Sequence, residues 1–245
     1  MAVNNIPAQA SPGDPKAGTE RDTQPPIAGL RFRELLCSAQ SWLEQHHEIV
    51  NALNVFPVPD GDTGTNMLLT MKSACREVTD EHTESVGEVA RAAAHGALMG
   101  ARGNSGVILS QILRGMAKSL AEQMELTGPE FAAALAEGSR VAYKGVNRPV
   151  EGTILTVARE AAAAAESAAE TDADLAFVLE HTVRAADRAV ANTPNLLPVL
   201  AQAGKVDSGG KGLFYILEGI HREVSGITTA TEGLVAVAAV PEAVP

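Results

Sequence analysis

The sequence predicts an all-helical, soluble protein built around one sizeable domain, and three observations lead to this prediction. Apolar residues recur at three- and four-residue spacing along most of the chain. Aromatic residues make up only 3% of the 245 residues while hydrophobic residues make up 45%, so the core must consist of alanine and aliphatic side chains, which suits close helix packing. Runs of alternating β-branched residues, the usual sign of strands, are absent.

The two ends of the chain differ from its middle. Residues 1–26 contain five prolines and almost no large apolar side chains, so we expect a flexible tail there. Residues 27–228 carry the helical pattern and form the expected domain. Residues 229–245 are rich in alanine and valine and are compatible with a strand, a linker or the start of another domain.

Within the domain, the periodicity places the helices in order. The first covers about residues 30–53, where apolar side chains share one face. Two helices are expected to begin at capping boxes, one formed by Ser85 with Glu88 and one by Thr127 with Glu130. The other expected helices cover residues 66–78, 107–125, 153–170, 175–191 and 212–224.

Charge and cysteine content exclude several classes of protein. Nineteen basic and 30 acidic residues give a net charge of −11, which repels nucleic-acid backbones. Only two cysteines are present, Cys37 and Cys75, and they indicate a reducing compartment. No apolar run is long enough to span a membrane, and the N-terminal residues are too polar for a signal peptide. We therefore expect a cytoplasmic protein without stable membrane insertion.

The connection between the first two helices has the composition of a metal–phosphate site. Asp60 and Asp62 lie two residues apart and can direct their carboxylates at one hard cation, and Asn54 can add a neutral oxygen. The helix that follows offers free backbone N–H groups to an anion. An Asx-type turn with a well-capped helix explains the same residues about equally well.

Three further connections combine glycines with hydroxyl, amide or charged residues just before a helix. They are residues 100–106, 147–153 and 206–212. Glycines there permit close approach of the backbone to a phosphate, although each turn alone is more simply a capped helix start. If the helices alternate in direction, several of these turns meet at one end of the bundle and can surround one nucleotide. No zinc-ligand spacing, Walker A loop or nucleophile elbow is present.

Five ordered segments resemble motifs of the dihydroxyacetone kinase L-subunit (DhaL) domain, and most closely those of the N-terminal ATP-binding domain of bacterial fatty acid kinases. They are residues 54–67, 99–111, 149–156, 192–197 and 206–213. Within the first segment, Pro57, Pro59 and Thr63 follow the fatty acid kinase version.

The resemblance implies a barrel of about eight antiparallel amphipathic helices with Mg-ATP at one end. Asp60 and Asp62 would ligate one or two Mg²⁺ ions, and Asn54 would be a third ligand although it lies one residue out of step with the family's additional aspartate. Phosphate contacts are implied for Thr63, Gly64, Thr65, Asn66, Asn104, Ser105 and Gly106. The resemblance also implies that the nucleoside part of ATP is lined by Thr153, Ile154, Asp207, Ser208 and Gly209.

The resemblance also implies an activity: transfer of the γ-phosphoryl group of ATP to a small substrate that a partner protein presents, here a fatty acid. The alternatives are a subunit of a dihydroxyacetone-type kinase with its own substrate-binding partner, and a non-catalytic ATP-sensing module; a homodimer is also compatible. Fatty acid kinases carry further domains after this one. We therefore expect either a stand-alone subunit or part of a longer protein that is inactive without the rest.

Overall fold

The computed structural model describes residues 25–79 and 83–227. The expected N-terminal tail lies outside these residues except for its last two positions, and the expected C-terminal linker lies wholly outside them. The described part consists of helices and one pair of two-residue strands. The all-helical fold class is therefore confirmed.

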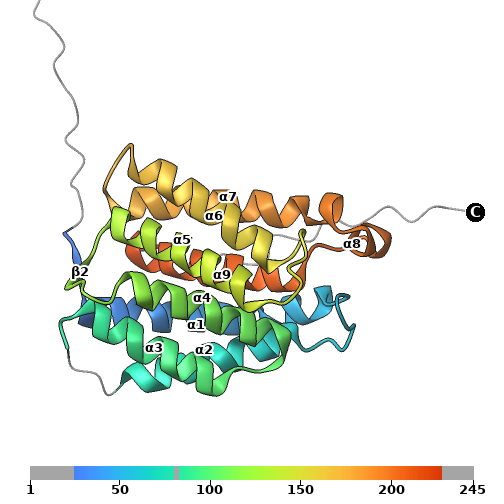
Figure 1. Cartoon of the computed structure of the whole chain (residues 1–245), viewed down its shortest axis with the longest axis horizontal. Helices are drawn as coiled ribbons and strands as arrows, with labels where there is room; N and C mark the ends of the chain where they lie inside the picture. Colours follow the sequence, from blue (N-terminus) through green and yellow to red (C-terminus); the bar gives the residue numbers. More distant parts are fainter. Residues whose placement is uncertain (1–24, 80–82, 228–245) are drawn as a thin grey trace, which may run out of the picture.

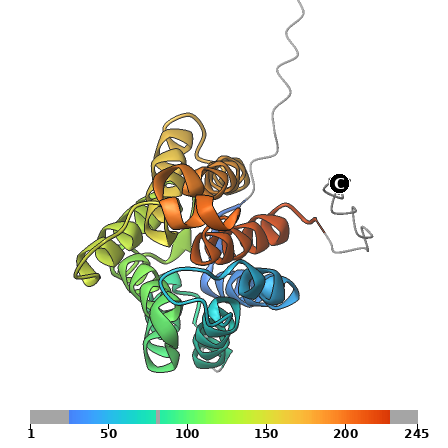
Figure 2. The same cartoon turned by 90° about the vertical axis from the view of Figure 1, so that its right-hand side faces the viewer.

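In the described part of the chain, eight long helices form a closed ring, which Figure 2 shows from one end. Each helix packs against the next, and the last of them closes the ring by packing against both α7 and α1. The ring helices are α1 (Gly29–Leu53), α2 (Thr63–Thr79), α3 (Val86–Gly100), α4 (Gly103–Ser119), α5 (Gly128–Gly145), α6 (Ile154–Ala169), α7 (Leu175–Leu196) and α9 (Ser208–Val224). The expected barrel of about eight helices is thus present.

The helices run alternately in opposite directions, as Figure 1 shows. Consequently α2, α4, α6 and α9 all begin at the right-hand end in that view. The four polar, glycine-rich connections of the sequence precede these four helices, so the alternation brings them to one end of the barrel. A short helix, α8 (Pro198–Ala203), follows α7 at the same end and was not predicted.

The interior of the barrel is filled by aliphatic side chains, two methionines and two phenylalanines, Phe32 and Phe131, both of which are buried. The cavity between them measures about 30 Å³, which is the space of about one water molecule. Its lining side chains are all apolar, from Phe32 on α1 to Ile220 on α9. The interior therefore has no room for an acyl chain.

Three helices begin earlier than their periodicity predicts. α2 begins at Thr63 instead of residue 66, α4 at Gly103 instead of 107, and α9 at Ser208 instead of 212. Their first turns contain glycine, serine, threonine and asparagine, which are weak helix formers, so local propensity places them in loops. α4 also ends at Ser119, six residues before the expected end. The prediction of these boundaries was wrong, and tertiary packing decides them.

Only one of the two expected capping boxes has the predicted backbone bond. The Ser85 hydroxyl accepts a hydrogen bond from the Glu88 N–H at 3.4 Å. Thr127 makes no such bond, and its hydroxyl instead donates to the Glu130 carboxylate. Both residues still precede the helix that they were expected to begin.

Two short strands were not predicted. β1 (Ile27–Ala28) pairs antiparallel with β2 (Glu125–Leu126) and ties the start of the domain to the connection between α4 and α5. Two residues are too few for an alternating pattern to be recognised in a sequence. No helix in the described part is both long enough and apolar enough to cross a membrane.

Candidate functional site

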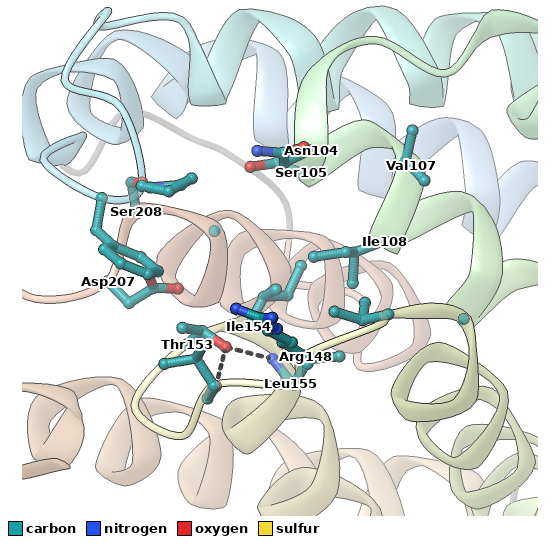
Figure 3. A pocket seen from close by; sticks show the side chains of 16 residues that line it. Asn104, Ser105, Val107, Ile108, Arg148, Thr153, Ile154, Leu155, Asp207 and Ser208 are labelled. Carbon is teal, nitrogen blue, oxygen red and sulfur yellow. Dashed lines mark hydrogen bonds between the residues drawn. The ribbon is translucent and has the colours of Figure 1, made fainter. Parts of the chain in front are cut away.

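A pocket of about 390 Å³ lies where the N-termini of α4, α6 and α9 meet (Figure 3). The connection between α1 and α2 adds Phe56 and Pro57 to its wall, and the connection between α5 and α6 adds Val146, Arg148 and Val150. Segments as far apart in the chain as Phe56 and Gly209 thus surround one space. Seven residues of the predicted site line it: Asn104, Ser105, Thr153, Ile154, Asp207, Ser208 and Gly209.

The lining has a polar part and an apolar part. In Figure 3, Asn104 and Ser105 lie across the pocket from Thr153, and Asp207 and Ser208 lie to the left of them. Much of the remaining wall is aliphatic and consists of Val107, Ile108, Val146, Val150, Ile154 and Leu155. Sequence reasoning predicted only Ile154 among them, because aliphatic side chains look like ordinary core residues. A polar part beside an apolar part suits a ligand with a charged end and a flat, less polar end.

The helix N-termini supply the positive potential of the site. The first N–H groups of a helix have no partner within the helix, and its dipole adds partial positive charge there. α2 is tied to the same end because the Ser208 hydroxyl donates a hydrogen bond to the Thr63 hydroxyl at 3.2 Å. Four helix N-termini therefore meet at one end of the barrel, an arrangement that favours a phosphate group.

The predicted carboxylate pair lies on the α1–α2 connection, beside the pocket and not among the residues that line it. Asp60 is exposed and Asp62 is half-buried. The Asn54 amide donates a hydrogen bond from Nδ2 to the Asp60 carboxylate at 2.7 Å. Because the amide nitrogen must face the carboxylate, Asn54 Oδ1 is left buried without a hydrogen-bond partner.

These residues fit a magnesium ion that is shared with a phosphate ligand. Among the described residues, no group of three or more histidine, cysteine, aspartate or glutamate side chains could hold a metal by itself. Mg²⁺ characteristically takes one or two carboxylates and completes its shell with substrate phosphates and water. Asp60, Asp62 and the free Asn54 oxygen match that donor set, and a site of this kind needs its nucleotide in order to hold the metal well.

Three predicted phosphate-binding residues have other contacts in the protein. Thr65 makes two hydrogen bonds with the Asn51 side chain. The Thr65 N–H donates to Asn51 Oδ1 at 3.1 Å, and Asn51 Nδ2 donates to the Thr65 hydroxyl at 3.0 Å. A Cβ on Gly64 would lie 2.1 Å from the His47 carbonyl oxygen, and one on Gly106 would lie 2.5 Å from the Thr70 hydroxyl. Both glycines thus permit close contacts between helices, whatever else they bind.

Asn51, like the aliphatic wall, was not predicted. It holds the first turn of α2 in place through Thr65. Its only signal in the sequence is a second asparagine three residues before Asn54. Asn66 was expected to contact a phosphate. A Cβ added to Gly103 would lie only 2.5 Å from Asn66 Nδ2, so the Asn66 side chain packs against the start of α4.

Residues 57–222 match the family model of the DAK2 domain. The chain belongs to the DAK2 domain family. It is 49% identical over 202 residues to protein YloV of Bacillus subtilis, covering 82% of this chain and 36% of YloV. An uncharacterized protein of Staphylococcus haemolyticus is 46% identical over 202 residues, with 82% of this chain and 37% of that protein covered. The chain thus spans about a third of the length of these relatives.

The fold also matches a solved structure. The dihydroxyacetone kinase of C. freundii in its native form superposes with a TM-score of 0.58 at 17% identity, over 88% of this chain and 38% of the kinase. The same kinase in complex with AMP-PNP and Mg²⁺ gives a TM-score of 0.57 at 17% identity over the same shares. At this identity the match establishes the fold of this DAK2 domain, which is that of the L-subunit domain.

The pocket of the DAK2 domain contains one deeply buried carboxylate, that of Asp207, which is 4% exposed. Asp207 caps α9 by accepting a hydrogen bond from the Gly210 N–H at 2.7 Å, and it accepts another from the Ile154 backbone. Burial raises the pKa of Asp207 to about 6 from an ordinary 3.8, although the two backbone hydrogen bonds oppose this change. The carboxylate therefore joins the start of α9 to the start of α6 across the pocket.

We expect the stability of the DAK2 domain to depend on pH through Asp207. The folded protein holds this proton more tightly than the unfolded chain, so the stabilisation is fully present below pH 3.8 and is lost as the pH rises through about 6. Urea unfolding of wild type and Asp207→Asn between pH 4 and 7 measures it. The free energy of unfolding of wild type relative to the variant should fall by about 2–3 kcal/mol across this range. A difference that stays constant with pH would contradict the assigned pKa.

Proposed function

We propose that this chain is the ATP-binding domain of a kinase that phosphorylates the carboxylate of a fatty acid, which a partner protein presents. The observation that carries the proposal is the convergence of three helix N-termini on one pocket beside the Asp60–Asp62 pair, with a fourth N-terminus, that of α2, tied to the same end of the barrel. Polyphosphates bind where helix N-termini and a carboxylate-held divalent cation meet. Membership of the DAK2 family and the resemblance of residues 54–67 to fatty acid kinases support the same conclusion.

The nucleotide is expected to lie with its phosphates toward the α1–α2 connection and its base toward the aliphatic wall. Asp60 and Asp62 would hold one or two Mg²⁺ ions, with Asn54 Oδ1 as a further oxygen ligand. The bound metal would neutralise phosphate charge as it develops during transfer. Asn104 and Ser105 stand at the start of α4, and no hydrogen bond with another described residue occupies their side chains, so both are available to phosphate oxygens.

The pocket lining supports a phosphate donor that depends on a partner for its acceptor. Among the described residues that line it there is no histidine, and its one carboxylate, Asp207, is already bound to two backbone N–H groups. Phosphoryl transfer depends mainly on positioning and charge neutralisation, and an in-line nucleophile has to be held close to the γ-phosphate. The filled barrel interior argues that the acyl chain resides on the partner.

The metal requirement can be tested by titration calorimetry. Because ATP and the two carboxylates repel each other, we expect binding of ATP with Mg²⁺ or Mn²⁺ and little heat in EDTA. ADP with Mg²⁺ serves as the comparison for the contribution of the γ-phosphate. Equal affinity for ATP with and without metal would contradict the proposed site.

The acceptor can be tested with the same preparation. The chain alone should hydrolyse ATP slowly, since unpositioned water is a poor acceptor. A protein loaded with fatty acid should allow ADP and acyl phosphate to form, either with this chain or with a longer form that includes the remaining length of its relatives. Transfer to dihydroxyacetone on its own binding protein would instead identify a hydroxyketone kinase. Rapid hydrolysis by the chain alone would make it an ATPase.

A further inference from the structure

The α5–α6 connection carries two charged side chains, and the structure gives them different surroundings. The carboxylate of Glu151 accepts hydrogen bonds from the Thr156 hydroxyl at 2.7 Å, the Tyr143 hydroxyl at 3.0 Å and the Arg159 guanidinium at 2.8 Å. Arg148 has no ion pair or hydrogen bond with another residue of the described part. Glu151 therefore does not neutralise Arg148, because its carboxylate already pairs with Arg159.

Arg148 lies in the wall of the pocket. In Figure 3 its side chain extends from the α5–α6 connection past Ile154 toward the middle of the space, between Thr153 on one side and Asn104 and Ser105 on the other. Every other lining residue in the described chain is neutral except Asp207. Arg148 is therefore the one cation of this lining, in a protein whose net charge is −11.

A free arginine in this position has a clear chemical partner if the pocket binds a nucleotide. A triphosphate is strongly anionic, one divalent ion neutralises only part of its charge, and Asp60, Asp62 and Asp207 add negative charge around it. A guanidinium carries a permanent charge and five N–H donors in a planar fork, which match the oxygens of a phosphate. It can form two parallel hydrogen bonds there.

We propose that Arg148 binds the phosphate chain of the nucleotide and closes the pocket over it from the α5–α6 side. This inference rests on the proposed function, in that the pocket must take ATP. It gives a role to the positive charge in residues 147–153, where the resemblance implied only Thr153 and the following Ile154 as nucleotide contacts. Arg148 approaches from the wall opposite α4, so the phosphates lie between its guanidinium and the N–H groups at the start of α4.

The test is titration of Arg148→Gln with a series of ligands that differ in phosphate number: Mg-ATP, Mg-ADP and adenosine, the last followed by saturation-transfer NMR. Loss of a charge-assisted pair should weaken Mg-ATP about 10- to 100-fold. The loss should be smaller for Mg-ADP and absent for adenosine. Arg148→Lys keeps the charge without the planar fork, and its affinity should lie between those of wild type and Arg148→Gln.

Lys144→Gln is the matched control. Lys144 is exposed in the last turn of α5, four residues before Arg148, and does not line the pocket. Its loss changes net charge equally and should leave the affinity for Mg-ATP within about twofold. An equal loss of ATP and adenosine affinity in Arg148→Gln would overturn the inference and place the guanidinium on the base. Unchanged affinity would also overturn it. Failure of wild type to bind Mg-ATP would instead refute the proposed function.

Discussion

Asp62→Ala is expected to abolish metal-dependent ATP binding, with an affinity for Mg-ATP at least about 100-fold below that of wild type. The substitution leaves Asp60 as the only carboxylate of the site, and one carboxylate with an amide oxygen holds a divalent ion poorly. The Asp62 side chain is half-buried and makes no hydrogen bond with another described residue, while its backbone carbonyl, which accepts from the Asn66 N–H at 2.8 Å, is retained. The fold should therefore be unaffected.

Calorimetry and circular dichroism on the same sample test both halves of this prediction. Asp187→Ala is a suitable control because Asp187 is an exposed aspartate on α7 that pairs with Lys211 at 3.6 Å and does not line the pocket. It should retain wild-type affinity. An Asp62→Ala protein that binds Mg-ATP normally would remove Asp62 from the site. One that unfolds would show that the Asp-Gly-Asp segment is mainly a structural turn.

Gly64→Ala is expected to destabilise the protein by about 3 kcal/mol, the upper end of the usual cost of overpacking. A Cβ at this position would lie 2.1 Å from the carbonyl oxygen of His47 and 2.9 Å from its carbon, so α1 and α2 would have to move apart. Both contacts are with backbone atoms, which cannot turn aside as a flexible side chain would. Alanine is otherwise favoured over glycine in a helix by about 1 kcal/mol, so any loss of stability has to come from this contact.

Gly61→Ala is the control for that experiment because it changes a glycine of the same segment. Gly61 has a φ of +71° and no atom within 4 Å of the added Cβ. The substitution should lower the free energy of unfolding by only about 1–2 kcal/mol, because alanine is less stable than glycine in the left-handed conformation. Urea unfolding of the two variants measures the difference. Equal destabilisation would mean that α1 and α2 can separate at a cost of only about 1–2 kcal/mol, and would contradict a tight backbone contact at Gly64.

The helix boundaries show where sequence reasoning works and where it stops. The span of α1 is predicted to within one residue because its apolar face is continuous and its turn residues follow at once. The first turns of α2, α4 and α9 are misplaced because residues such as Gly64 and Gly106 have low helix propensity. Contact with other helices holds these turns helical, such as α1 for the first turn of α2 and α2 for that of α4, and no local pattern contains such contacts.

The candidate site divides in the same way. Polar residues at helix starts, such as Asn104 and Asp207, can be recognised because their chemistry is unusual at those positions. The aliphatic wall cannot, since Val107 and Ile108 carry the same spacing as core residues of α4. Arg148 is visible as a charge in a turn, but its lack of a partner depends on where Glu151 and Arg159 lie in space.

The sequence by itself determined that the chain is helical, that its helices follow one another through short connections, and that four of these connections carry oxygen-rich, glycine-containing segments. These features depend only on residue types and their spacing along the chain, and not on which residues are in contact in the folded protein. The tertiary structure alone decided that the four segments meet, that Gly64 serves the contact between α1 and α2, and that the barrel interior is closed. It also decided that the Asp207 carboxyl holds its proton up to a pH of about 6. Distances across the barrel and exclusion of water set these features, and both exist only once the helices have assembled.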